Sequence, residues 1–183
     1  ICSKPEQAEA LFRLGYDYVE WPVAPLLGKL SDEGFRELRT KTESLKIRPE
    51  TWNILLPAAI KVVGPQADRE TLRTYLTTVL ARAAALGGRI VVFGSGRSRQ
   101  IPEGWAYEDA VNQFIEASVI AGDIAAQHGM TIVLEPLNKE ESNFLNSVEE
   151  GIELVKRINH PSVKLLSDLY HVAAENEPFD HTK

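Results

Sequence analysis

Apolar residues along this chain follow two alternating patterns. In five stretches they recur every three or four positions, as on one face of an amphipathic helix. Between these stretches they gather in short runs rich in β-branched and aromatic residues, which are typical of strands. The helical pattern covers residues 3–15, 32–45, 68–86, 107–128 and 147–158. The strand pattern covers residues 16–21, 52–56, 89–93, 130–134 and 163–167.

This alternation predicts βαβ units, with a parallel sheet and the helices outside it. With a strand tail at residues 1–2 included, we expect about six strands. Two architectures fit this count. One is a small open α/β sheet; the other is a (β/α)8 TIM barrel with about six of its eight units, because a complete barrel takes about 250 residues and the chain has 183. Composition does not change along the chain, so residues 1–183 are expected to form a single, partial domain.

Composition and charge limit the classes of protein to which this chain can belong. The chain is 44% hydrophobic and 25% charged, the balance of a soluble globular domain. It shows no signal-peptide pattern and no apolar stretch near the roughly 20 residues of a membrane helix. The net charge of −6 disfavours nucleic acid as a partner. The single cysteine, Cys2, excludes an internal disulfide and fits a reducing cytoplasm. We therefore expect a cytoplasmic protein.

The clearest candidate chemistry lies where two predicted strands end. Glu135 directly follows the apolar run 131–134, and Asp168 follows residues 163–167 one βα unit later, with His171 three positions on. Ligands of parallel α/β proteins bind at the carboxyl ends of the strands, so the two carboxylates should meet there and repel each other. A divalent cation between them would remove the repulsion and act as a Lewis acid.

An ordinary structural role for these acids is the alternative. Glu135 and Asp168 could each be a helix cap or a surface loop acid. Their repeated position, with His171 nearby, favours the metal site. Oxygen ligands beside an imidazole suit Mn, Mg, Co or Zn, and the pattern does not choose among them.

Several other polar and aromatic residues have two interpretations. Arg97 and Arg99 follow the predicted strand 89–93 and could hold a phosphate or carboxylate, although loop arginines are more often solvated. Trp21 and Trp105 could line a sugar pocket, or simply pack in the core. We expect Cys2 to be a small buried residue rather than one facing a pocket.

Three segments carry a family resemblance. Residues 134–138 (LEPLN), followed by Glu141, Asn143 and Asn146, resemble the strand-end motif of the sugar isomerase/epimerase barrels. Residues 167–171 (SDLYH) resemble the family's Asp-Thr-Tyr-His-Met segment, and residues 15–20 (GYDYVE) resemble its early strand. The chain is thus similar in register, along nearly its whole length, to the xylose-isomerase-like TIM-barrel superfamily, which includes sugar phosphate isomerases and epimerases and AP endonuclease family 2.

The resemblance implies a role for each matching residue. Glu135 would be both a metal ligand and a catalytic acid/base, and Asp168 a second metal ligand. His171 and Glu141 would contact substrate hydroxyls, and Glu20 would lie near the substrate. The implied cofactor is one divalent metal, and the implied substrate is a small carbohydrate or sugar phosphate.

The implied reaction is proton abstraction next to a ketose carbonyl, through an enediolate, by a metal-dependent sugar isomerase or epimerase. The alternatives are an inosose-dehydratase-like lyase, an endonuclease IV-like phosphodiesterase, for which four histidines are few, and an inactive fragment. The family also uses a histidine from the seventh strand and a second glutamate from the eighth. Residues 1–183 supply neither, since His181 follows Asp168 too closely, so we expect a truncated barrel. Its open strand edges would favour a homo-oligomer.

Overall fold

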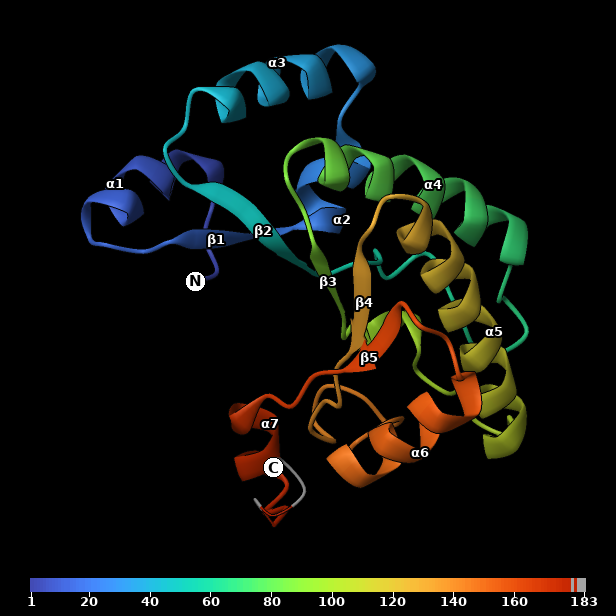
Figure 1. The fold of residues 1–183 in the computed structure, drawn as a ribbon. Helices are drawn as coiled ribbons and strands as arrows, with labels where there is room; N and C mark the ends of the chain where they lie inside the picture. Colours follow the sequence, from blue (N-terminus) through green and yellow to red (C-terminus); the bar gives the residue numbers. More distant parts are fainter. Residues whose placement is uncertain (179, 181–183) are drawn as a thin grey trace.

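The protein is an α/β structure built on one parallel sheet, shown in Figure 1. The computed structural model describes residues 1–178 and 180. The five strands lie side by side in chain order, β1-β2-β3-β4-β5. They are β1 (Tyr18–Pro22), β2 (Arg48–Asn53), β3 (Ile90–Phe93), β4 (Thr131–Leu134) and β5 (Val163–Leu165). All neighbouring pairs are parallel, so the carboxyl ends of all five strands lie at one edge.

The predicted strand tail at the start of the chain is present as a short extended segment beside β1. Cys2 forms a parallel bridge with Glu20. The amide of Ser3 donates to the carbonyl of Glu20 (2.9 Å), and the amide of Glu20 donates to the carbonyl of Ile1 (2.8 Å). The prediction of an incomplete barrel with about six strands is confirmed as five strands and this pairing segment.

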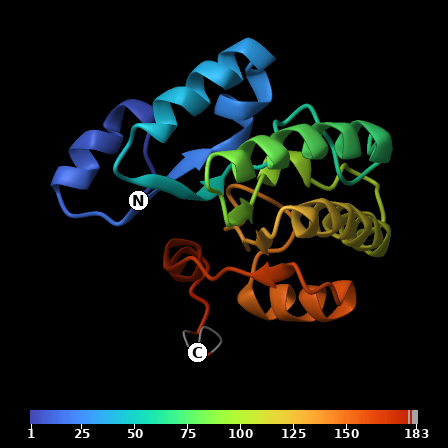
Figure 2. The same ribbon diagram turned by 45° about the horizontal axis from the view of Figure 1, so that its top comes forward.

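The helices follow their strands along the chain. They are α1 (Ala8–Arg13), α2 (Val23–Leu26), α3 (Asp32–Glu43), α4 (Arg69–Ala85), α5 (Tyr107–Gln127), α6 (Val148–Ile158) and α7 (Leu169–Ala174), with 3-10 turns η1 (Pro5–Gln7), η2 (Leu27–Lys29) and η3 (Gly96–Ser98). Figures 1 and 2 show α3, α4, α5 and α6 in chain order along the outside of the curved sheet. None of the helices in residues 1–178 is long and apolar enough to cross a membrane.

The second strand differs from its prediction. It covers Arg48–Asn53 rather than residues 52–56, because Ile54 has a left-handed backbone (φ 47°) that ends it. Leu55 and Leu56 are nevertheless buried, so the second half of this apolar run is a loop packed in the core. A run of apolar residues indicates burial rather than a strand as such. Here burial continues beyond the end of β2, at Leu55 and Leu56.

The tryptophans have packing roles. Trp21 and Trp52 are fully buried and meet edge to face, with ring centroids 5.9 Å apart. Trp105 packs partly buried against the same core. Neither Trp21 nor Trp105 lines the cavity described below, so the sugar-wall interpretation of these two residues is wrong. His181 lies outside the described residues.

Candidate metal and substrate site

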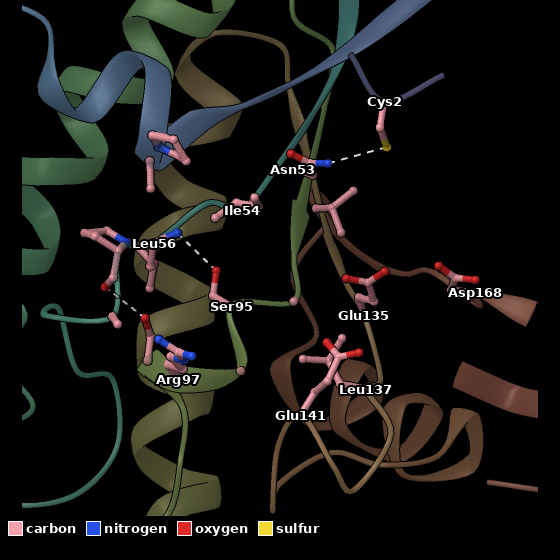
Figure 3. Close-up of a pocket in the computed structure, with 18 of the residues that line it drawn as sticks. Cys2, Asn53, Ile54, Leu56, Ser95, Arg97, Glu135, Leu137, Glu141 and Asp168 are labelled. Atoms are coloured by element: carbon pink, nitrogen blue, oxygen red, sulfur yellow. Dashed lines mark hydrogen bonds between the residues drawn. The ribbon is translucent and has the colours of Figure 1, made fainter. Parts of the chain in front are cut away.

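A cavity of about 670 Å³ opens at the carboxyl ends of the strands. Its volume is in the range of about 300–1,000 Å³ that is usual for small-ligand sites. Glu20 comes from β1, Asn53 from β2, Glu135 from the end of β4, and Asp168 and His171 from the segment after β5. Figure 3 shows Glu135, Asp168 and Glu141 on one side of this cavity and Arg97 on the other. The residues to which the family motifs gave a site role, Glu20, Glu135, Glu141, Asp168 and His171, all line it.

Three potential ligands converge in this cavity. Glu135, Asp168 and His171, referred to below as the triad, each offer one ligand atom. These atoms lie within 4.8 Å of one another. Two carboxylates and an imidazole are donors that a divalent transition metal accepts. The spacing and the donor chemistry therefore fit a divalent cation held mainly by Glu135 and Asp168.

Glu135 is positioned by β4 and by a glycine opposite. The main-chain amide of Glu135 donates to the carbonyl of Phe93 (3.4 Å), which continues the β3–β4 ladder one residue beyond the strand. A Cβ atom on Gly94 would collide with Oε2 of Glu135. Gly94 is therefore the residue that leaves room for the carboxylate. The sequence does not indicate this role of Gly94, because its contact with Glu135 joins residues of neighbouring strands that lie far apart in the chain.

The environment of Glu135 makes it hard to ionise. Burial, followed by the negative charge of Asp168, raises the pKa of Glu135 from 4.5 to about 7. Arg99 opposes this shift, while Glu20 and Glu141 add to it. Without a cation, the ionised carboxylates of Glu135 and Asp168 repel each other. A bound cation would relieve this repulsion.

The position of Asp168 is compatible with both roles that the sequence offered as alternatives. Its Oδ1 accepts a hydrogen bond from the amide of Tyr170 (2.8 Å), so that it caps the first turn of α7. The same side chain lies beside Glu135 and His171. A helix cap and a ligand position are therefore compatible in this residue, because capping occupies one of its two oxygens.

The hydrogen bonds of His171 assign its proton. His171 is buried, and its Nδ1 lies 3.1 Å from the main-chain N–H of Asn138, which can only donate. In the neutral ring the proton then lies on Nε2. An N–H at Nε2 is able to donate to a hydroxyl group, whereas a metal ligand needs a lone pair there. This arrangement favours the predicted substrate contact.

Glu20 belongs to a second polar group in the cavity lining, with Cys2 and Asn53. Its Oε1 accepts from Sγ of Cys2 (2.8 Å) and from Nδ2 of Asn53 (2.9 Å). Cys2 is exposed and lines the cavity, so the expectation of a buried residue is wrong: the extended segment at residues 1–3 ends at the cavity rim. Partial burial and the Glu20 carboxylate raise the pKa of the Cys2 thiol from 9.0 to about 11.

Glu141 lies at the rim beside the triad. It is exposed, and its Oε1 accepts a hydrogen bond from Nδ2 of Asn138 (3.2 Å). Since Asn138 also contacts His171, one amide side chain orients both predicted substrate contacts.

The two arginines after β3 have different environments. Arg97 is exposed and lines the cavity. Arg99 is 0% exposed, and its guanidinium donates to main-chain carbonyls rather than to a ligand. Burial lowers the pKa of Arg99 to about 9, against the opposing effect of Glu135. The interpretation of Arg99 as a phosphate holder is therefore wrong.

Hydrogen bonds join two loops, residues 56–62 and residues 95–98, into one wall of the cavity. The amide of Leu56 donates to Oγ of Ser95 (3.0 Å), and Oγ of Ser98 donates to the carbonyl of Pro57 (3.1 Å). The amide of Val62 donates to the carbonyl of Ser98 (2.9 Å), and Nζ of Lys61 donates to the carbonyl of Arg97 (2.8 Å). The backbone that carries Arg97 is thereby fixed.

The parallel β/α order, with an acidic cavity at the strand ends, places this protein in the class of β/α-barrel proteins. The family model of the xylose isomerase-like TIM barrel matches residues 8–182. The chain belongs to this family, as its motifs predicted.

Relatives and solved structures agree with this assignment. D-psicose 3-epimerase of Ruminiclostridium cellulolyticum is 25% identical over 177 residues, covering 92% of this chain and 58% of the epimerase. A crystal structure of D-psicose 3-epimerase in the presence of D-fructose has a TM-score of 0.81 at 22% identity, covering 97% of this chain and 62% of that one. An AP endonuclease family 2 structure from Brucella melitensis has a TM-score of 0.73 at 24% identity, covering 91% and 63%. Both structures show the fold alone, and the chain spans less than two thirds of each of the three proteins.

Proposed function

We propose that this protein is a metal-dependent sugar isomerase or epimerase acting next to the carbonyl of a small ketose. The observation that carries the proposal is the convergence of Glu135, Asp168 and His171 within 4.8 Å in a sugar-sized cavity. A curated relative that matches along nearly the whole chain, a D-psicose 3-epimerase, supports a ketose as substrate.

Glu135 is the proposed base. Without a cation the pKa of Glu135 is raised to about 7; a bound cation would favour the ionised carboxylate, which is the form that accepts a proton from carbon. A bound divalent cation, held by Glu135 and Asp168, would polarise the carbonyl and stabilise negative charge that develops there. Glu135 would take the proton from the carbon beside the carbonyl and, in an isomerase, return it to the neighbouring carbon.

The remaining residues would hold the substrate. The N–H at Nε2 of His171 donates to a substrate hydroxyl, and the carboxylate of Glu141 accepts from another. Glu20, oriented by Cys2 and Asn53, faces the far end of the sugar. Lys29 and Arg97 also line the cavity, and they would meet a phosphate if the ketose is phosphorylated.

The test is exchange of a substrate proton with solvent. The full-length protein with Mn²⁺ is incubated in D₂O with a panel of ketoses and ketose phosphates, and deuterium at the carbon beside the carbonyl is followed by NMR. We expect exchange that depends on metal and falls by about 10²–10⁴ in Glu135→Gln. Glu140→Gln, which changes an exposed neighbouring glutamate, is the matched control and should leave exchange unchanged.

Other outcomes separate the competing activities. Loss of water from a keto-inositol without release of an isomer would indicate a dehydratase. Nicking of abasic DNA without any exchange would indicate a phosphodiesterase. Absence of metal binding by the full-length protein would refute all three activities and leave a non-catalytic role.

A further inference from the structure

Among the described residues, two arginine side chains are buried, and one of them contacts the backbone of the proposed base. Arg99 is 0% exposed and Arg82 is 9% exposed. Nη2 of Arg99 donates to the carbonyl of Glu135 (2.9 Å) and to that of Leu145 (3.4 Å), while Nη1 donates to the carbonyl of Phe93 (3.4 Å). A buried charge is costly unless it is hydrogen-bonded, so this arrangement needs a reason.

The three carbonyls belong to three segments that meet behind Glu135. Phe93 is the last residue of β3, and its carbonyl also accepts from the amide of Glu135. Leu145 lies in the loop before α6, in a left-handed conformation (φ 59°), and its carbonyl also accepts from the amide of Leu137. One guanidinium therefore connects three segments by hydrogen bonds: the end of β3, the residue after β4, and the loop before α6.

We propose that Arg99 is a positioning residue that holds the main chain of Glu135 so that its carboxylate points at Asp168. The proposal rests on the metal site proposed above. Arg99 is absent from the cavity lining among the described residues, so it acts through Glu135 and not on the substrate.

The geometry of the guanidinium explains why the residue is an arginine. Its planar fork carries five N–H donors and reaches several carbonyls at once, whereas a lysine offers a single nitrogen. The ring of Phe114 lies beneath it, with its centroid 5.9 Å from Cζ. The positive charge also favours the ionised form of the neighbouring carboxylate, which is the form that binds a cation.

Arg82 provides a matched control. It is buried to a similar degree, and it also donates to two main-chain carbonyls, those of Leu27 (2.9 Å) and Leu30 (2.8 Å). Its third partner is Asp32 (2.7 Å), and none of the three is a residue of the triad. A purely structural effect of losing a buried arginine should appear in both positions.

The experiment compares Arg99→Met with Arg82→Met in the full-length protein, measuring Tm without metal and Mn²⁺ affinity by calorimetry. We expect both variants to lose Tm, and only Arg99→Met to lose Mn²⁺ affinity, by about 10- to 100-fold as for other residues that orient a ligand. Arg99→Lys retains the charge without the fork and should show a smaller loss of affinity.

Equal affinity in Arg99→Met and the unchanged protein would overturn the proposal, and so would an equal loss in Arg82→Met. If Arg99→Met does not fold, Arg99→Lys with Arg82→Lys decides the question in the same way. Failure of the unchanged protein to bind Mn²⁺ would instead refute the proposed function.

Discussion

The raised pKa of Glu135 predicts an unusual effect of pH on stability. Without metal, the carboxyl group has a pKa of about 7 in the folded protein and about 4.5 in the unfolded chain. The unfolded chain therefore loses this proton first as pH rises from 4.5 to 7, and folding becomes less favourable over that interval. The change from 4.5 to 7 corresponds to about 3 kcal/mol, because each pKa unit is worth about 1.4 kcal/mol. Partial contact with solvent reduces this to about 1–3 kcal/mol.

Glu135→Gln removes the titrating group and should remove this penalty. We expect the variant, relative to the unchanged protein, to gain about 1–3 kcal/mol in free energy of unfolding between pH 5 and pH 8. Urea unfolding at pH 5, 6.5 and 8 in the presence of EDTA measures the gain, and Glu140→Gln serves as the exposed control. A stability difference that does not change between pH 5 and pH 8 would refute the assigned environment of Glu135.

Three further predictions concern the same cavity. Gly94→Ala should lower Mn²⁺ affinity by at least about tenfold, because its methyl group would displace the Glu135 carboxylate; Gly34→Ala, in α3, is the control, and unchanged affinity in Gly94→Ala would contradict the contact. Mn²⁺ affinity should fall as pH drops from 8 to 6, since binding must displace the proton of Glu135; a flat calorimetric profile would contradict this. Cys2, whose thiol pKa is about 11, should react slowly with iodoacetamide at pH 8 and faster in Glu20→Gln; mass spectrometry measures the rate, and equal rates would show that Glu20 does not hold the thiol.

The sequence was most informative where the geometry of a parallel sheet is fixed. Glu135 and Asp168 each follow a strand, and parallel strands bring their carboxyl ends to one edge, so their proximity follows from position alone. The order of strands and helices follows from the same periodicity. Family motifs then assigned substrate contacts to Glu20, Glu141 and His171, which the structure places in the cavity lining.

What the sequence could not predict depends on contacts between distant segments. Nothing near Arg99 distinguishes a solvated loop arginine from one that holds three carbonyls of residues up to 46 positions away. The space that Gly94 leaves for Glu135 is likewise a contact between neighbouring strands. The end of β2 also escaped prediction, because the left-handed and exposed Ile54 interrupts an apolar run whose later residues, Leu55 and Leu56, are buried.

The hydrogen bonds between residues 56–62 and 95–98 have a consequence for how this protein can acquire new substrates. Because the two loops share donors and acceptors, replacing one of them leaves orphaned polar groups on the other. Recombination between relatives should therefore succeed only when both loops are exchanged as a pair. The residues of both loops, which would determine selectivity on this side of the barrel, would then be inherited together.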